Sequence, residues 1–361
     1  MSESTKPTQT KIPETKLKSY LDIVHECDSY TLLPYINHIF NIYHQADNAI
    51  FFRFPYMQQD VEAYRKYVSA FHAFKINGYP QILGYMRNEI VEKFPWPEPT
   101  WKVVKSAEGE SGTITLMSPI GATADERTKL INDTLQTARD TFDVIKGKAW
   151  RNENYPIRIP GKEEVLGSME RAAACLFGIQ TWGIHMTAYV VNDKGEYLLW
   201  VPKRSETKST FPGMLDNSVA GGMATGETPF ECMLREADEE ASIPREVAKN
   251  AIATGALRYI YERGADAGGE KGLLQPECEY IYDLKLPANV ILKPNDNEAA
   301  NFILMPINDV ITELKKGKFK SNCGIVIVDF LVRHGFITPE GESDYEEICS
   351  RMHRKLGYPN L

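Results

Sequence analysis

The residues best suited to do chemistry lie in one segment, GGMATGETPFECMLREADEEASI, which spans 221–243. Glu236, Glu239 and Glu240 stand at positions i, i+3 and i+4 of a helix predicted to begin at Thr228-Pro229, a capping hydroxyl followed by a first-turn proline. At 100° per residue the three carboxylates share one helix face. Carboxylates this close repel one another unless a cation lies between them. Hard oxygen ligands at this spacing suit Mg²⁺, and Mn²⁺ is an alternative.

An arginine in the same helix fits this interpretation. Arg235 precedes Glu239 by one turn and can also reach back toward Glu227. That pairing would hold the loop on the helix and leave Glu236 and Glu240 for the metal. The alternative is an acidic, solvated helix face, which is what most acidic runs are.

The Gly-rich turn before the helix is the second part of the predicted metal site. Gly221 and Gly222 let the main chain approach an ion closely. We therefore expect a backbone carbonyl near Ala220 or Gly221 to complete the ligand shell.

The spacing of Gly221, Glu227, Arg235 and the three glutamates resembles the Nudix box of diphosphate hydrolases, Gly-x5-Glu-x7-Arg-Glu-U-x-Glu-Glu-x-Gly-U. The sequence departs from that pattern at Ser242, where the family has glycine. That glycine commonly ends the helix in a left-handed conformation, which costs serine roughly 1 kcal/mol more. The departure concerns the helix end and leaves the ligands intact.

The likeness extends beyond the box. Segments 202–222, 275–287, 294–306 and 319–340 resemble a eukaryotic Nudix subgroup whose members carry an extra N-terminal domain, and some of whose relatives are fused to thiamine pyrophosphokinase. The resemblance implies hydrolysis of oxidised, damaged thiamine diphosphate (oxo- and oxythiamine diphosphate) to the monophosphate. It also implies a Nudix α/β/α sandwich with a mixed sheet, preceded by a smaller α+β domain.

Roles follow for the carboxylates as a hypothesis. Glu236 and Glu240 bind Mg²⁺ directly, and Glu239 is a third ligand or binds a second metal. A general base is Glu239 or Glu298, because Nudix enzymes often place a base in the loop that holds Glu298. The alternative for Glu298 is an exposed loop carboxylate.

Candidate substrate contacts lie outside the box. Lys203, Arg204 and Lys208 form a basic loop that could bind phosphate, or could simply be solvated. A heteroaromatic substrate needs a stacking wall, although aromatic residues at strand spacing are more often core. The candidates for that wall are Trp182, Trp200, Phe211, Tyr259 and Tyr261. Glu277 and Glu279 could hydrogen-bond a polar ring edge or face water.

At 361 residues the chain is expected to form two domains. We divide it into a disordered leader (1–17), an N-terminal α+β domain (18–148), a connector and helix (149–178) and a Nudix domain with C-terminal helices (179–361). The connector covers 149–160 and the helix 164–177.

Periodicity predicts elements within both domains. In the first we expect an apolar stretch (31–45), a short strand (50–52), helices at 60–74 and 124–147, a strand followed by a helix in 81–94, and strands at 101–104 and 112–117. In the second we expect a hairpin of 182–191 and 196–201, strands at 255–262, 277–286 and 301–305, and helices at 307–314, 323–333 and 345–356.

Composition narrows the class and compartment. A net charge of −8 argues against a general nucleic-acid or membrane-surface binder. The six cysteines are scattered and predict reduced thiols, and no apolar run reaches transmembrane length. We expect a cytoplasmic monomer or homodimer acting on a small-molecule diphosphate. ADP-ribose, NADH, coenzyme A or a nucleoside triphosphate are alternative substrates, and a non-catalytic Nudix-fold binding module or a Nudix-fold isomerase are alternative classes.

Overall fold

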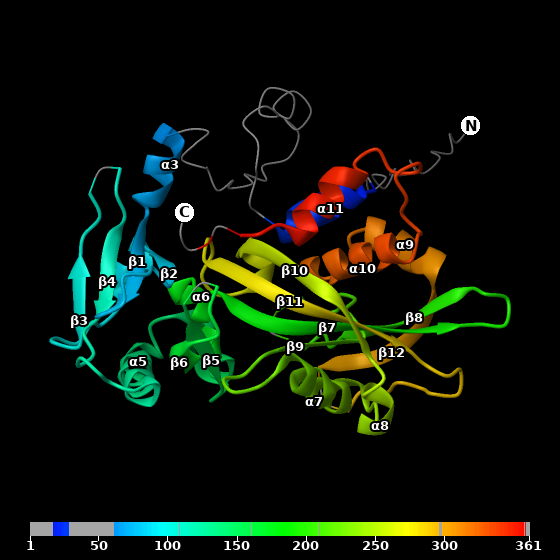
Figure 1. The fold of residues 1–361 in the computed structure, drawn as a ribbon, viewed down its shortest axis with the longest axis horizontal. Coiled ribbons are helices and arrows are strands. Elements are labelled where there is room, and N and C mark those ends of the chain that lie inside the picture. The colour runs from blue at the N-terminus through cyan, green and yellow to red at the C-terminus, as the bar shows by residue number, and fades with distance from the viewer. Residues whose placement is uncertain are drawn as a thin grey trace, which may run out of the picture.

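The computed structural model describes residues 17–28, 61–107, 109–159, 161–208, 210–295, 298–356 and 358. The predicted apolar stretch 31–45 and strand 50–52 lie outside the described residues. The described residues form two large sheets, one in each half, and a two-stranded sheet in the segment between them (Figure 1). No helix in the described ranges has the length and apolar character needed to cross a bilayer.

The first half is built on a four-stranded sheet of order β2-β1-β4-β3, in which β1 and β4 run parallel and the other pairs antiparallel. Its elements are α3 (Val61–Val68), β1 (Phe71–Ile76), β2 (Gly84–Arg87), α4 (Asn88–Lys93), β3 (Trp101–Val104), β4 (Gly112–Leu116), α5 (Ala124–Ala138) and the short turns η1 (Asp143–Ile145) and η2 (Gly147–Ala149). The strands at 101–104 and 112–117 and the strand-then-helix at 81–94 are confirmed. Two predicted helices are too long. The helix predicted at 60–74 is followed by β1, which begins at Phe71, and the helix predicted at 124–147 ends at Ala138.

The segment predicted as a connector and a helix is largely a β-hairpin. β5 (Asn154–Arg158) pairs antiparallel with β6 (Val165–Glu170). The connector at 149–160 and the helix at 164–177 are therefore wrong over these two strands. Among the described residues of this segment the only α-helix is α6 (Ala174–Phe177), which follows the turn η3 (Arg171–Ala173).

Long-range hydrogen bonds explain why this segment is extended. The Ser168 amide donates to Thr128 Oγ1 (2.8 Å) and the Glu170 amide to Asn132 Oδ1 (3.0 Å), both on α5. These bonds satisfy backbone donors that a helix would satisfy internally. Tertiary contacts override a weak local preference here, so pattern reading missed the hairpin.

The second half is a mixed sheet between two helical layers. β7 pairs parallel with β11 and antiparallel with β8 and β9, in the order β10-β11-β7-β8-β12. Its elements are β7 (Thr181–Val191), β8 (Tyr197–Arg204), β9 (Val219–Gly222), α7 (Pro229–Ala241), α8 (Arg245–Ala248), β10 (Ile252–Glu262), η4 (Ala265–Ala267), β11 (Leu274–Lys285), β12 (Ala299–Pro306), α9 (Ile307–Lys315), α10 (Ser321–Arg333) and α11 (Tyr345–His353). Helices α7 and α8 lie on one side of the sheet and α9, α10 and α11 on the other (Figure 1). The predicted α/β class, mixed-sheet sandwich, strands and helices of this half are confirmed, with α11 ending at His353.

One helix from the start of the chain belongs with these C-terminal helices. Helix α1 (Tyr20–Cys27), expected in the N-terminal domain, packs instead in one apolar cluster with α10 and α11 through Ile23 and Val24. The next residue, buried Asp28, accepts hydrogen bonds from Arg354 Nη2 (2.5 Å) and the Ile260 amide (3.2 Å). Residues far apart in sequence thus close the core behind the sheet.

Candidate active site

Helix α7 begins and ends where the sequence predicts. The Thr228 hydroxyl oxygen accepts a hydrogen bond from the Glu231 amide (3.3 Å), and Pro229 occupies the first turn. Ser242 takes the left-handed conformation that ends the helix, with φ 54° and ψ 35°. Its hydroxyl donates to the Lys293 carbonyl (3.1 Å), which offsets part of the cost of placing serine there.

Arg235 links the helix to the preceding loop. Its Nε and Nη2 donate to the two oxygens of Glu227 (2.8 and 3.0 Å), confirming the predicted pairing. Its Nη1 donates to Glu236 Oε1 (2.7 Å) and Glu239 Oε2 (3.0 Å). The pairing with Glu227 does not keep Arg235 away from Glu236, because the planar guanidinium spans both neighbours.

The Gly-rich turn lies directly against the helix. A Cβ at Gly221 would lie 2.0 Å from Glu236 Oε1, and a Cβ at Gly222 would lie 1.5 Å from the Tyr155 hydroxyl. The two glycines are thus needed for the close approach of Glu236 and Tyr155, whereas the predicted approach of the main chain to a metal ion stays a prediction. The Ala220 amide donates to Glu240 Oε2 (2.9 Å), which fixes the second carboxyl on the same turn.

Two glutamates of α7 are held in an environment that disfavours their charge. Burial, reinforced by Glu239, raises the pKa of Glu236 to about 7 despite the opposing effect of Arg235. Burial, followed by the field of Glu236, raises the pKa of Glu240 well above its ordinary value. Because both side chains offer only hard oxygens and repel each other, a divalent cation such as Mg²⁺ fits the two and would relieve the repulsion.

The third glutamate stands apart from this pair. The Glu239 side chain is 53% exposed and bonded to Arg235. In the described parts of the chain, no three His, Cys, Asp or Glu side chains converge as a ready metal site. The structure therefore brings Glu236 and Glu240 together at the Gly turn, and leaves Glu239 on the outer edge of the helix.

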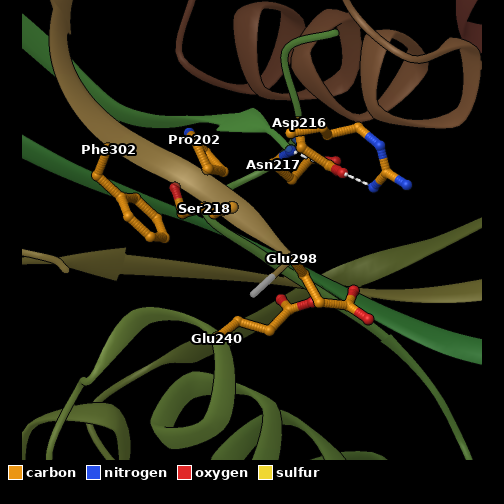
Figure 2. A pocket seen from close by; sticks show the side chains of 9 residues that line it. Pro202, Asp216, Asn217, Ser218, Glu240, Glu298 and Phe302 are labelled. Atoms are coloured by element: carbon orange, nitrogen blue, oxygen red, sulfur yellow. Dashed lines mark hydrogen bonds and ion pairs between the residues drawn. The ribbon is translucent and has the colours of Figure 1, made fainter. Parts of the chain in front are cut away.

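Glu298 lies beside Glu240 in a small pocket of about 20 Å³, which has room for roughly one water molecule. Figure 2 shows the two carboxyl groups side by side, with Asp216 on the opposite wall. Lys208 Nζ contacts Glu298 Oε1 (2.5 Å). Burial raises the pKa of Glu298, but the ion pair with Lys208 lowers it by more, so the net pKa is below its ordinary value and the carboxylate is ionised at neutral pH. Glu298 therefore lies next to a carboxylate of α7, and its role as the general base stays a prediction.

Comparisons with known proteins agree with this geometry. The NUDIX domain family model matches residues 182–323, and a domain of unknown function (DUF4743) matches residues 56–181. A Nudix hydrolase of Deinococcus radiodurans is 38% identical over 135 residues, which are 37% of this chain and 70% of that protein. This chain belongs to the Nudix hydrolase family.

Two eukaryotic relatives extend the likeness of this Nudix hydrolase into the first domain. The uncharacterized protein YJR142W of Saccharomyces cerevisiae is 42% identical over 243 residues, 66% of this chain and 70% of that protein. Nudix hydrolase 20, chloroplastic, of Arabidopsis thaliana is 40% identical over 232 residues, 64% of this chain and 59% of that protein. The chain thus spans less than two thirds of the Arabidopsis protein. It is a hydrolase acting on phosphorus-containing anhydrides, with a separate domain before the Nudix domain.

The three basic side chains predicted to bind phosphate, Lys203, Arg204 and Lys208, are all paired with carboxylates. Arg204 is 8% exposed and donates to Asp216 Oδ2 (2.5 Å), the Phe211 carbonyl (3.0 Å) and the Thr210 carbonyl (2.9 Å). The expected phosphate role of Arg204 is corrected, because all three of its nitrogens hold this loop together. Lys203 pairs with exposed Glu206 (3.2 Å).

The predicted aromatic wall is also largely internal. Tyr259 has no exposed surface, and its hydroxyl donates to Glu277 Oε2 (2.5 Å) and Glu279 Oε1 (3.2 Å). Trp200 is 8% exposed and packs in the core beneath α7. The stacking roles predicted for these two side chains are wrong, because their strand positions face the core. Phe211 is only partly exposed and lies near Lys320, with Nζ 5.9 Å from its ring centre.

Sequence reasoning missed three residues near the box. Tyr155 lies on Gly222, Arg171 lies over Tyr155, and Asp216 lines the pocket. None has a fixed spacing to the box, and the first two lie on β5 and directly after β6, in the segment that was expected to be a connector and a helix. A strand prediction at 154–158 would have been the signal for them.

Proposed function

We propose that this hydrolase is a divalent-metal-dependent diphosphatase that converts oxidised thiamine diphosphate, such as oxo- or oxythiamine diphosphate, to the monophosphate and phosphate. The observation that carries the diphosphatase activity is the joining of Glu236, Glu240 and Glu298 at one Gly turn and one pocket. The resemblance of segments outside the box to the thiamine-related subgroup supports the substrate.

In this proposal one group of residues binds the metal ion and another removes a proton from the attacking water. Mg²⁺, when bound, neutralises phosphate charge and acidifies water. Glu236 and Glu240 would hold that ion, and Arg235 keeps Glu236 in place through its link to Glu227. Glu298 would accept the proton of the water that attacks phosphorus, and its ion pair with Lys208 keeps it ionised for this role.

The buried carboxyl of Glu279 on β11 supports a leaving group that is cationic or rich in N–H donors. Glu279 is buried on β11, where a Cβ on neighbouring Gly183 would lie 2.3 Å from its carboxylate and 2.9 Å from the Gly221 carbonyl. Burial, then the field of Glu277, raises the pKa of Glu279 to about 8. Binding a thiazolium ring or the N–H donors of an aminopyrimidine beside Glu279 would favour its ionised form, whereas a second phosphate group would disfavour it.

A panel of diphosphates tests the substrate assignment. Wild-type protein with Mg²⁺ is incubated with oxythiamine, oxothiamine and thiamine diphosphates, ADP-ribose, NADH and coenzyme A, and the release of phosphate and monophosphate is followed. We expect the highest kcat/KM for the two oxidised thiamine diphosphates. A preference for ADP-ribose or NADH would contradict the proposed substrate but not the diphosphatase activity. No turnover of any compound would favour a non-catalytic binding module.

A further inference from the structure

We propose that the domain of unknown function at residues 56–181 completes the active site: Arg151 and Arg171, at the two ends of the β5–β6 hairpin, bind the substrate diphosphate across from the carboxylates of α7. This inference rests on the proposed diphosphatase function and deepens it. It gives the domain of unknown function, which covers both arginines, a role in phosphate binding.

The β5–β6 hairpin is fixed directly to the loop of the Nudix box. The Asn154 carbonyl accepts hydrogen bonds from the amide (2.9 Å) and the hydroxyl (3.1 Å) of Thr225. The Thr225 hydroxyl is also hydrogen-bonded to Ser168 Oγ (2.8 Å), on the second strand of the hairpin. Thr225 lies between the Gly turn and α7, so any side chain carried by the hairpin has a defined position relative to the box.

A continuous set of contacts leads from the hairpin to the metal-binding carboxylates. The Arg171 guanidinium carbon lies 5.1 Å from the ring centre of Tyr155, whose hydroxyl abuts Gly222. The carboxylate of Glu236 packs against the main chain of the adjoining Gly221. Burial opposes the charge on Arg171, yet the surrounding anionic groups, Glu236 among them, raise its pKa.

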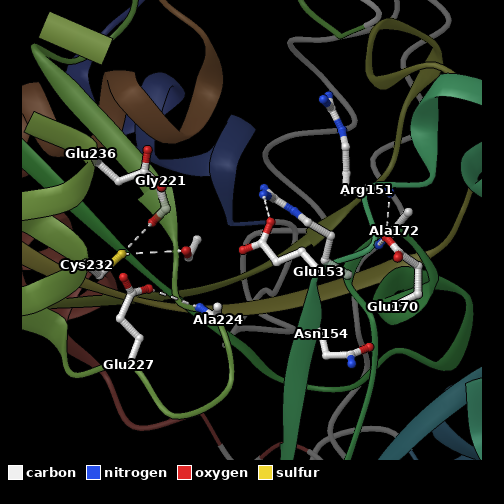
Figure 3. A network of polar contacts seen from close by, with 12 residues as sticks. Arg151, Glu153, Asn154, Glu170, Ala172, Gly221, Ala224, Glu227, Cys232 and Glu236 are labelled. Atoms are coloured by element: carbon white, nitrogen blue, oxygen red, sulfur yellow. Dashed lines mark hydrogen bonds and ion pairs between the residues drawn. The ribbon is translucent and has the colours of Figure 1, made fainter. Parts of the chain in front are cut away.

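Both arginines keep donors for a ligand. Arg171 Nη1 pairs with Glu153 Oε2 (2.5 Å), and Figure 3 shows Glu153 between the Gly221 side of the network and the end of β6. Within the described residues this is the only hydrogen bond of the guanidinium, which has five N–H donors and a side chain 36% exposed. Arg151 is exposed and forms no ion pair with a described residue. The Arg151 amide donates to Glu170 Oε1 (3.0 Å), which fixes Arg151 at the end of β6 next to Arg171 (Figure 3), and its charge also lowers the pKa of Glu298.

The chemistry of the site calls for such groups. The box supplies carboxylates, and its own Arg235 is committed to Glu227, Glu236 and Glu239. A diphosphate carries several negative charges that one cation between two carboxylates does not balance. Arginine is suited to bind phosphate oxygens bidentately, which makes Arg151, just before β5, and Arg171, just after β6, a matched pair of phosphate ligands.

The test uses Arg171→Gln, Arg151→Gln and the double variant. Arg245→Gln is the control, since Arg245 pairs with Glu231 on the exposed side of α7 (3.0 Å). The inhibition constant of inorganic pyrophosphate, KM and kcat are measured at several salt concentrations, with Mn²⁺ affinity by electron paramagnetic resonance and Tm alongside. We expect each single change to weaken pyrophosphate binding about tenfold and the double change about a hundredfold, with a shallower salt dependence. Mn²⁺ affinity should stay at the wild-type value, and Arg171→Lys should recover part of the loss.

The outcomes separate this inference from the proposed function. Pyrophosphate binding by the double variant within twofold of wild type overturns the inference, as does an equal loss in Arg245→Gln. If Arg171→Gln fails to fold, Arg151→Gln still decides, because Arg151 is exposed. Wild-type protein that binds pyrophosphate through these arginines but hydrolyses no diphosphate would sink only the proposed function. Wild-type protein that does neither would contradict both.

Discussion

Adding one methyl group at Gly221 is a stringent test of how the site is built. In Gly221→Ala the new Cβ would lie 2.0 Å from Oε1, 2.1 Å from Cδ and 2.4 Å from Cγ of Glu236. Side-chain atoms rarely approach closer than about 3 Å, so the carboxyl must move by roughly 1 Å. A displacement of that size at a reacting group costs about a hundredfold in rate, so we expect kcat to fall by about that factor.

The assay separates displacement from unfolding. Steady-state kcat with Mg²⁺ and thermal unfolding are measured for Gly221→Ala and for the control Gly264→Ala, whose new Cβ would meet nothing closer than 3.9 Å. We expect the control to keep wild-type kcat and both variants to stay folded. A Gly221→Ala enzyme with wild-type kcat would refute the argument that Glu236 must lie against this turn.

Two further changes test groups behind the sheet. Asp283 is buried, and although burial raises its pKa, His334 and Arg333 lower it more; Asp283→Asn should therefore cost about 3 kcal/mol of unfolding free energy at pH 7. Because the folded-state pKa is depressed, that stabilisation is present above the unfolded pKa of about 4 and is lost as pH falls below it, so denaturation curves of variant and wild type should converge in acid. Equal stability at pH 7 would contradict this. Tyr259→Phe removes the hydroxyl that joins Glu277 and Glu279 and should lower the unfolding free energy by about 1–3 kcal/mol; an unchanged urea midpoint would show that the bridge is not needed.

The sequence was most informative where neighbours along the chain decide the structure. The cap at Thr228 and the Arg235–Glu227 pair follow from local spacing, and the structure has both of them. Strands of the second sheet were also predictable, because alternation and turn residues mark them.

Features that depend on distant partners were not predictable in the same way. The sequence predicts that Arg204 is available to bind phosphate, but in the structure its charge is paired with Asp216. The sequence allows Tyr259 to stack on a substrate, but in the structure its ring is buried in the core. The β5–β6 hairpin depends on hydrogen bonds from α5, and α1 depends on a surface formed by α10 and α11 at the other end of the chain. A single sequence contains these residues but not their pairing.

The most direct measurement is the hydrolysis of oxythiamine diphosphate by Glu240→Gln, with Asp238→Asn as the control. Glu240 is held on the Ala220 amide beside Glu236 and Glu298, whereas Asp238 is exposed on the same helix. With saturating Mg²⁺ we expect Glu240→Gln to lose at least about a hundredfold in kcat while retaining the wild-type Tm, and Asp238→Asn to match wild type. A Glu240→Gln enzyme that releases phosphate at the wild-type rate would contradict the assignment of this helix as the metal-binding centre.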